Sequence, residues 1–288
     1  MAIDYEQLKN WRFEERTDRY DLRDSIIYAL TLGYGDTPSD TNDLRYIYEY
    51  DTLAVPTLLA TIGAPGAWAT DPELGINWVK LLHGEHRITF HAPVPAKASV
   101  ISQTRVTHVI DKGAEKGALV VTTRDIFNAE GRQPLATVEH VSFLRADGGF
   151  GRSDEPLLAL PATPTTPPDA TLLVRSTPQS AALYRLNGDL NPIHILPSMA
   201  EKAGFDRPIL HGLCTYGMAA RALIKHCCPT DPGRLGSLSV RFSSPFFPGE
   251  TLRVEIWKMD NRVQFRALAH ERNVVVLSHG VAGLREVA

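Results

Sequence analysis

The residues of this chain best suited to chemistry are an aspartate and a histidine five positions apart, Asp189 and His194. They lie in the segment YRLNGDLNPIHILPSMAEKAGFDRPILHGLC, residues 184–214, where Asn191-Pro192 favours a turn over a continuous helix. Such a turn can direct both side chains into one cavity. A carboxylate and an imidazole that share a small polar space can accept and return a proton near pH 7. The pair therefore predicts general acid/base catalysis on a water molecule.

Both residues also have a simpler structural interpretation. Asp189 is typical of a turn or of a helix cap, and His194 fits a hydrogen-bonded histidine beside the core. The next element favours the catalytic interpretation. Residues 213–224 are apolar on nearly every side and predict a buried helix that Gly212 begins. Free backbone N–H groups at its start would donate to an oxyanion, and we expect Gly212 to provide one.

A longer pattern surrounds the pair. It runs Tyr184-x-Leu186-x-Gly188-Asp189-x-Asn191-Pro192-x-His194 and continues with Ala203-Gly204-Phe205 and Ile209-Leu210-His211-Gly212-Leu213. This string resembles the hydratase 2 motif of the (R)-specific enoyl-CoA hydratases, the MaoC-like group. The strings DLRYIYE (43–49), HGE (83–85), DKG (111–113) and GGFG (148–151) resemble its long, two-repeat members, such as the hydratase part of the peroxisomal multifunctional enzyme. The resemblance covers the chain from about residue 20 to the end.

The resemblance implies a double hotdog fold, in which Asp189 and His194 hold the water that adds across the double bond of an enoyl-CoA. It also implies an acyl-CoA thioester as substrate, and we expect neither a metal nor a cofactor besides the CoA of that substrate. Two positions depart from the motif: Asn187 stands where a small residue such as Ser is usual, and His86 stands where Gln is common. Neither belongs to the pair, so we relate both departures to acyl preference.

Other residues have weaker grounds for a role. Glu49 lies in a string where an acid supports activity in the family that the chain resembles, although surface or salt-bridged glutamates are commoner. Cationic donors suit the phosphates of CoA, although lysine and arginine occur on every surface. The pair itself needs neighbours that orient it, and Tyr184 and Asn191 fit that role. The candidates for substrate binding are Tyr184, Asn191, His211, Arg221, Lys225 and Arg241.

Length and charge exclude several classes of protein. The 288 residues allow one large core or two ordinary ones, since domains usually run about 100 to 200 residues. A net charge of −3 without a long basic run argues against nucleic acid as a partner. No stretch approaches the roughly 18 to 20 apolar residues that span a bilayer, so we expect no membrane partner either.

Cysteines and the chain ends bear on the compartment. Cys214, Cys227 and Cys228 provide neither a disulfide framework nor the paired spacing of a zinc site, which fits a reducing compartment. Residues 1–20 lack the apolar centre of a signal peptide, and residues 285–288 carry no peroxisomal tripeptide. We therefore expect a cytoplasmic enzyme, and a homodimer as its assembly.

The elements that must position the pair form two similar series. Residues 20–32 have helical spacing with acids near the start, and residues 55–68 predict a second, buried helix. Residues 76–94 are strand-like, and an antiparallel meander follows, across which a helix is expected to lie. Its three β-rich runs are residues 99–110, 117–128 and 135–144.

Three strings recur in the same order in the second half, which favours a duplication. YALTLG (28–33) matches YRLNGD (184–189), VPTLLATIG (55–63) matches RPILHGLCT (207–215), and APVPAKASV (92–100) matches PFFPGETLRV (245–254). Five prolines between Gly151 and Ala170 indicate a linker. We predict an α+β double hotdog, two helix-wrapped antiparallel repeats joined edge to edge in one continuous sheet. Its parts are residues 1–150, the linker 151–170 and residues 171–288.

The halves differ where the chemistry lies. In place of the aspartate and histidine the first half has GYGDTPSD, residues 33–40, without a histidine. We expect one active site, with the N-terminal repeat accommodating a medium, long or bulky acyl chain. The resemblance implies reversible hydration of trans-2-enoyl-CoA to (3R)-hydroxyacyl-CoA, in fatty acid or sterol side-chain β-oxidation. An acyl-CoA thioesterase and a non-catalytic acyl-CoA binding subunit are the alternatives on the same fold.

Overall fold

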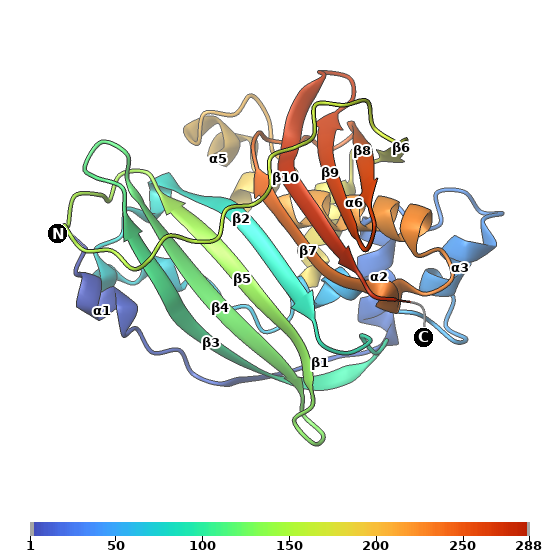
Figure 1. The fold of residues 1–288 in the computed structure, drawn as a ribbon, viewed down its shortest axis with the longest axis horizontal. Helices are drawn as coiled ribbons and strands as arrows, with labels where there is room; N and C mark the ends of the chain where they lie inside the picture. Colours follow the sequence, from blue (N-terminus) through green and yellow to red (C-terminus); the bar gives the residue numbers. More distant parts are fainter. Residues whose placement is uncertain (1–2, 287–288) are drawn as a thin grey trace.

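A single antiparallel sheet of ten strands organises the computed structural model, which describes residues 3–286 (Figure 1). The strand order is β1-β3-β4-β5-β2-β7-β10-β9-β8-β6. The strands are β1 (Arg16–Tyr20), β2 (Leu81–Phe90), β3 (Ala98–Asp111), β4 (Ala118–Asn128), β5 (Pro134–Leu144), β6 (Ala170–Arg175), β7 (Leu235–Phe242), β8 (Thr251–Met259), β9 (Arg262–Ala269) and β10 (Val274–Leu284). The three predicted runs of the meander correspond to β3, β4 and β5 to within a residue or two.

The two halves of the sheet meet where β2 pairs with β7. Glu85 lies opposite Arg241 and Thr89 opposite Ser237 in this antiparallel pair. The pairing satisfies the backbone groups of two strands that would otherwise be exposed edges. The predicted edge-to-edge junction is thereby confirmed.

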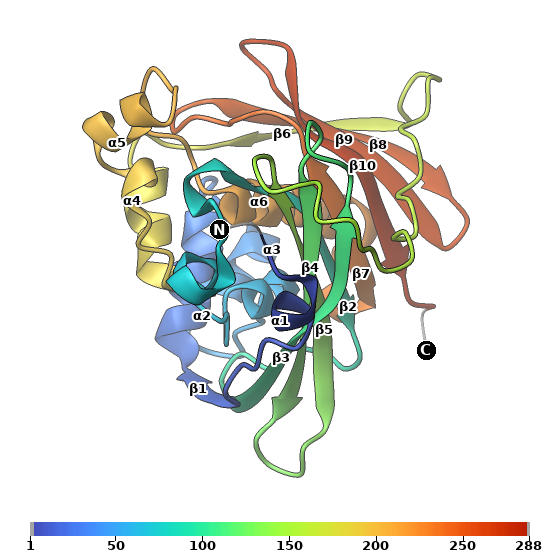
Figure 2. The same cartoon turned by 90° about the vertical axis from the view of Figure 1, so that its left-hand side faces the viewer.

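The helices are α1 (Tyr5–Lys9), α2 (Leu22–Thr31), α3 (Thr41–Ile47), α4 (Ser180–Tyr184), α5 (Pro197–Lys202) and α6 (Gly212–Cys227). Figure 2 shows α2, α4 and α6 on the same side of the sheet. Every residue of α6 from Cys214 to Ile224 is buried, as its apolar composition on all sides predicts. The predicted helix at residues 20–32 is also confirmed as α2, where Asp21 and Asp24 form a reciprocal capping box.

The helix predicted over residues 55–68 is wrong. The structure has a five-residue 3₁₀ helix, η1 (Pro56–Ala60), and a short 3₁₀ turn, η2 (Trp68–Thr70). Gly63 between them has a left-handed φ of 67°, and a Cβ there would lie 2.0 Å from the Oγ of Ser102 on β3. The chain therefore leaves the helical path where it passes against the sheet, a requirement that apolar composition alone does not reveal.

The proline-rich segment contains neither helix nor strand from residue 151 to residue 169. It crosses the face of the sheet opposite α6, as the yellow-green trace of Figure 1 shows. Leu158 O accepts a hydrogen bond from Arg87 at 2.9 Å, and Thr166 O accepts one from Trp257 at 2.9 Å. The boundaries at 150 and 170 stay predictions, because the sheet continues across both halves.

Two expectations about location concern the membrane and the C-terminal tripeptide. Each helix within residues 3–286 is too short or too polar to cross a membrane. The C-terminal tripeptide considered above includes residues outside the described range.

Candidate active site

Two short 3₁₀ turns present the candidate aspartate. The first, η5 (Arg185–Asn187), ends at Gly188, whose φ of 103° suits glycine, and the second, η6 (Pro192–His194), follows Asn191. The Asn191 side chain accepts a hydrogen bond from the N–H of Ile193 at 3.1 Å, and Pro192 occupies the first position of the turn. The turn predicted from Asn-Pro is thus confirmed, and Asp189 lies between the two turns.

The turn brings Asp189 and His194 together, along with His211. One nitrogen or carboxylate oxygen of each residue lies within 4.8 Å of those of the other two. The rings of His194 and His211 are stacked, with centroids 3.7 Å apart and planes 27° apart. Asp189 is exposed whereas both histidines are buried. A water that makes hydrogen bonds of about 2.8 Å to two such groups fits this separation.

His194 is held in one tautomer. Its Nδ1 lies 2.9 Å from Ile209 O, and because a carbonyl only accepts, Nδ1 carries the hydrogen. The lone pair is therefore on Nε2. Burial lowers the pKa of His194, an effect that the hydrogen bond to Ile209 and the charge of Asp189 oppose. The ring is consequently neutral at pH 7 and able to accept a proton.

His211 and Tyr184 form the buried side of the site. The Nε2 of His211 donates to the backbone oxygen of Asp189 at 3.2 Å, which ties the two segments together. Burial, reinforced by His194, lowers the pKa of His211 to about 4. The ring of Tyr184 packs against His211 at 4.9 Å, and its hydroxyl is buried without a hydrogen-bond partner among residues 3–286.

Gly212 is the first residue of α6, and its N-cap His211 makes no side-chain capping hydrogen bond. The first N–H groups of a helix lack acceptors within the helix, and the dipole of a 16-residue helix adds partial positive charge there. A Cβ at position 212 would lie 3.1 Å from the ring of Phe242, which accounts for a glycine. The helix start therefore offers backbone donors beside the pair.

Three other predicted candidates come from α6 and from the bend after α3. Glu49 is exposed in the bend after α3. Arg221 is buried on α6 with its guanidinium bound to Asp36 and Asp43, and Lys225 binds Asp40 and Asp43 (Arg221–Asp43 2.8 Å, Lys225–Asp40 2.6 Å). The structure thus places Arg221 and Lys225 in an ion network between α6 and residues 36–43, because each cation is already neutralised by carboxylates. Their assignment as CoA-phosphate ligands stays a prediction.

Arg241 also has a carboxylate partner, since it donates to Glu85 at 2.7 Å across the β2–β7 junction. Its side chain remains 46% exposed, so it retains surface for a ligand.

Sequence reasoning missed a second group of histidines, His83, His86 and His140, whose rings lie close together. The only signal was the departure from the motif at His86, because His83 and His86 lie on β2 whereas His140 lies on β5, 54 positions further along the chain than His86.

Family models match both halves of the chain. The description "MFE-2 hydratase 2 N-terminal domain" covers residues 19–146, and "MaoC like domain" covers residues 159–279. The chain is 38% identical to "Enoyl-CoA hydratase 2, peroxisomal" of Arabidopsis thaliana over 90% of its own length and 88% of the relative's. It is 37% identical to "Peroxisomal multifunctional enzyme type 2" of Mus musculus over 90% of its own length. It spans only 36% of that enzyme, about a third of its length.

Solved structures agree on the fold. The MaoC-like dehydratase from Phytophthora capsici superposes with a TM-score of 0.87 at 32% identity, covering 99% of this chain and 100% of that one. A Mycobacterium tuberculosis protein described as a double hotdog has a TM-score of 0.57 at 13% identity over 95% and 96% of the two chains, a likeness of fold alone. The predicted double hotdog is confirmed. With relatives this similar over nearly its whole length, the chain belongs to the MaoC-like hydratase 2 family.

Proposed function

We propose that the chain catalyses the reversible hydration of trans-2-enoyl-CoA to (3R)-hydroxyacyl-CoA. The observation that carries the proposal is the approach of the Asp189 carboxylate to a neutral His194 whose Nε2 is free, next to the start of α6. The relative from Arabidopsis thaliana is named an enoyl-CoA hydratase 2, which supports the same reaction. The multifunctional relatives are longer proteins, so nothing else of their activity enters the proposal.

The proposed chemistry needs three functions. Asp189 orients the water and His194 Nε2 accepts a proton from it, so that oxygen bonds to C3 of the alkene. The electrons of the double bond move toward the thioester, whose oxygen gains negative charge and is stabilised by the N–H of Gly212. The pair then returns one proton to C2, which restores its starting charge. Water held on one side of the alkene gives a product of single handedness.

Other residues have positioning roles in this proposal. Asn191 shapes the turn, while His211 and Tyr184 support Asp189 and His194 from the buried side. Glu49 stays a prediction of a residue that supports activity. Arg241 stays a proposed contact for the substrate.

Several finer predictions also remain. They are the acceptance of medium, long or bulky acyl chains through the N-terminal repeat, a place in β-oxidation, the homodimer and the cytoplasmic location. For the last, the word "peroxisomal" in the names of both relatives points to another compartment for those proteins.

The test compares hydration of crotonyl-CoA by the wild type, Asp189→Asn and His194→Gln. We expect each variant to lower turnover by at least about two orders of magnitude, the scale of a general acid/base group, with an unchanged circular dichroism spectrum. His270→Gln, at an exposed histidine directly after β9, serves as the matched control and should leave turnover unchanged. Near-normal turnover of either active-site variant would remove the pair from the mechanism.

The product and the acyl range are tested separately. Chiral analysis should find the (3R)-hydroxyacyl-CoA from both crotonyl-CoA and a decenoyl-CoA, whereas an (S) product would overturn the stereochemical proposal. Restriction to the four-carbon substrate would contradict the acyl-chain role of the first repeat. Release of free thiol from a saturated acyl-CoA, without hydration of the enoyl-CoA, would favour the thioesterase instead.

A further inference from the structure

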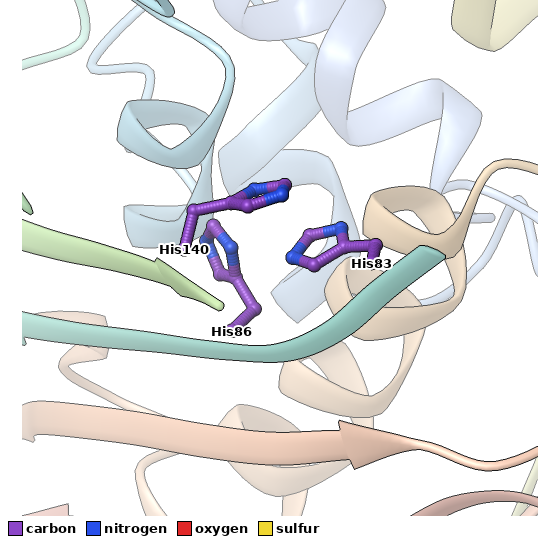
Figure 3. Close-up of side chains that lie close together, drawn as sticks. All are labelled: His83, His86 and His140. Atoms are coloured by element: carbon purple, nitrogen blue, oxygen red, sulfur yellow. The ribbon is translucent and has the colours of Figure 1, made fainter. Parts of the chain in front are cut away.

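Three histidines converge on the helix-facing side of the sheet, as Figure 3 shows. His86 on β2 lies directly opposite His140 on β5 in the strand register. His83 would face the other side if β2 alternated regularly, but a register shift between residues 83 and 85 turns it to the same side. The centroids of the His83 and His140 rings are 3.7 Å apart, and those of His83 and His86 are 5.2 Å apart.

The ring nitrogens of this cluster are poorly satisfied. Both nitrogens of His86 and the Nε2 of His83 are buried without a hydrogen-bond partner among the described residues 3–286. A buried polar atom in that state has lost its hydrogen bonds to water without a replacement, which is unfavourable. A ligand that engages the nitrogens together would remove several such costs.

We propose that His83, His86 and His140 bind one divalent transition-metal ion, with a fourth position open to water. One nitrogen of each ring already lies within 4.8 Å of those of the other two. Zn–N bonds of about 2.0–2.1 Å in a tetrahedron place the nitrogens roughly 3.4 Å apart, so the rings must close slightly. Three imidazoles and a water form a known catalytic and binding set for Zn²⁺, and imidazole also suits Cu²⁺ and Ni²⁺.

The neutral imidazole rings favour binding of a metal cation, whereas a neighbouring arginine opposes it. Burial is the main cause that lowers the pKa of all three rings, to about 4 for His140, so each lone pair is available at neutral pH. The nearby Arg124, which donates to the backbone oxygens of residues 59 and 60, repels a cation. A bound hydroxide would offset that repulsion, because a metal lowers the pKa of its water.

The cluster lies one side chain from the candidate active site. The ring of Phe242 is 4.5 Å from that of His83 and also packs against the start of α6 at Gly212. The ring of Tyr216, one turn into α6, is 5.0 Å from that of His86. An ion here would hold β2 and β5 together behind α6. Cysteine spacing, the basis for expecting no metal, could not reveal a site built of histidines.

The experiment measures Zn²⁺ binding to the full chain after removal of metal with EDTA and dialysis. Calorimetry should find one Zn²⁺ per chain for the wild type. Loss of a residue that only supports a metal ligand typically costs 10–100-fold in affinity, so His86→Gln should weaken Zn²⁺ binding by at least about 100-fold. The glutamine is the residue common at this position of the motif, which makes the variant suitable for folding. His140→Gln removes a different ligand and should weaken Zn²⁺ binding in the same way.

Two controls separate this site from other histidines. His270→Gln, an exposed position, should bind Zn²⁺ as the wild type does. His194→Gln disrupts the only other described group with comparable spacing, which is Asp189, His194 and His211. This variant should also bind Zn²⁺ as the wild type does. Co²⁺ should give the visible absorption of a four-coordinate site in the wild type and lose it in His86→Gln. Zn²⁺ should raise the unfolding temperature of the wild type but not of that variant.

The proposal is overturned if the wild type binds no Zn²⁺. It is equally overturned if binding survives both His86→Gln and His140→Gln, or disappears in His194→Gln alone, which would locate the ion at the candidate active site. None of these readouts depends on hydratase activity, so the proposed function is unaffected by the result.

Discussion

Replacing Arg221 by methionine tests whether this residue serves the fold or the substrate. Its Nη2 donates to Asp36 at 2.9 Å and to Asp43 at 2.8 Å. The Arg221 side chain is 4% exposed and that of Asp43 is 1% exposed, so the second pair has almost no access to water. Methionine keeps much of the apolar stem but removes the charge and its donors. Asp43 would then be left with Lys225 as its remaining cation, at 3.0 Å.

The expected loss of stability in Arg221→Met follows from the burial of Asp36 and Asp43, the carboxylates that Arg221 binds. Removing one member of a buried ion pair costs about 3–5 kcal/mol, because the remaining charge is stranded. Lys225 still faces Asp43, and Asp36 is 40% exposed and can be solvated, so we expect the lower end, about 3 kcal/mol. At about 2–4 °C per kcal/mol, the melting temperature should fall by on the order of 6 to 12 °C.

The assay combines thermal or urea unfolding with steady-state kinetics on crotonyl-CoA. Arg221→Met should lower stability and leave KM nearly unchanged at a temperature where the variant is folded. The matched control is Arg152→Met, whose partner Glu6 forms a pair exposed on both sides (60% and 59%) and should cost no more than about 1 kcal/mol. A stable Arg221→Met with a strongly raised KM would refute the structural interpretation and support the predicted phosphate role.

Two further predictions concern stability. Burial lowers the pKa of His140 to about 4 in the folded chain, whereas an unfolded histidine has a pKa of about 6.5. Between these two pH values the unfolded chain binds more protons than the folded one. The contribution of His140 to stability is therefore fully present above pH 6.5 and is lost as the pH falls toward 4. We expect urea unfolding to show roughly 2 kcal/mol less stability at pH 5 than at pH 7.5 from this residue, and a flatter profile in His140→Gln, whereas identical profiles would contradict the burial argument. Separately, Gly217→Val should cost about 1–3 kcal/mol, since a Cβ there would lie 2.6 Å from the side chain of Leu32, the C-cap residue of the neighbouring α2. An unchanged urea midpoint would show that this contact relaxes freely.

The features that sequence predicted correctly have local causes. The Asn-Pro step fixes the turn between Asp189 and His194, and the acids at positions 21 and 24 fix the start of α2. Runs of β-branched and apolar residues between polar breaks located β3, β4 and β5. In each case the residues that determine the element lie within it or beside it, so a single sequence contains the signal.

The features that sequence missed depend on contacts between distant residues. Arg221 meets Asp36 and Asp43 across 185 and 178 positions, and nothing near Arg221 in sequence indicates a buried acid. His140 likewise reaches His86 only through the pairing of β5 with β2. A cationic or imidazole side chain carries the same local pattern whether it binds a phosphate, a carboxylate or a metal, so the partner has to come from the fold.

The short 3₁₀ helix η1 of the first half explains why a buried arginine, Arg124, lies near the histidine group His83, His86 and His140 on the inner face of the sheet. A regular helix satisfies its carbonyl groups internally, whereas η1 ends after five residues and leaves the oxygens of Leu59 and Ala60 for another donor. Arg124 on β4 donates to both, at 3.2 and 2.8 Å, and thereby places a buried cation beside His86 and His140. In the second half α6 continues for 16 residues, and its N-cap His211 stacks on His194 of the candidate pair. The two halves thus differ at these helices: the start of α6 provides the proposed oxyanion donors, whereas η1 lies beside a polar interior that can accept a ligand.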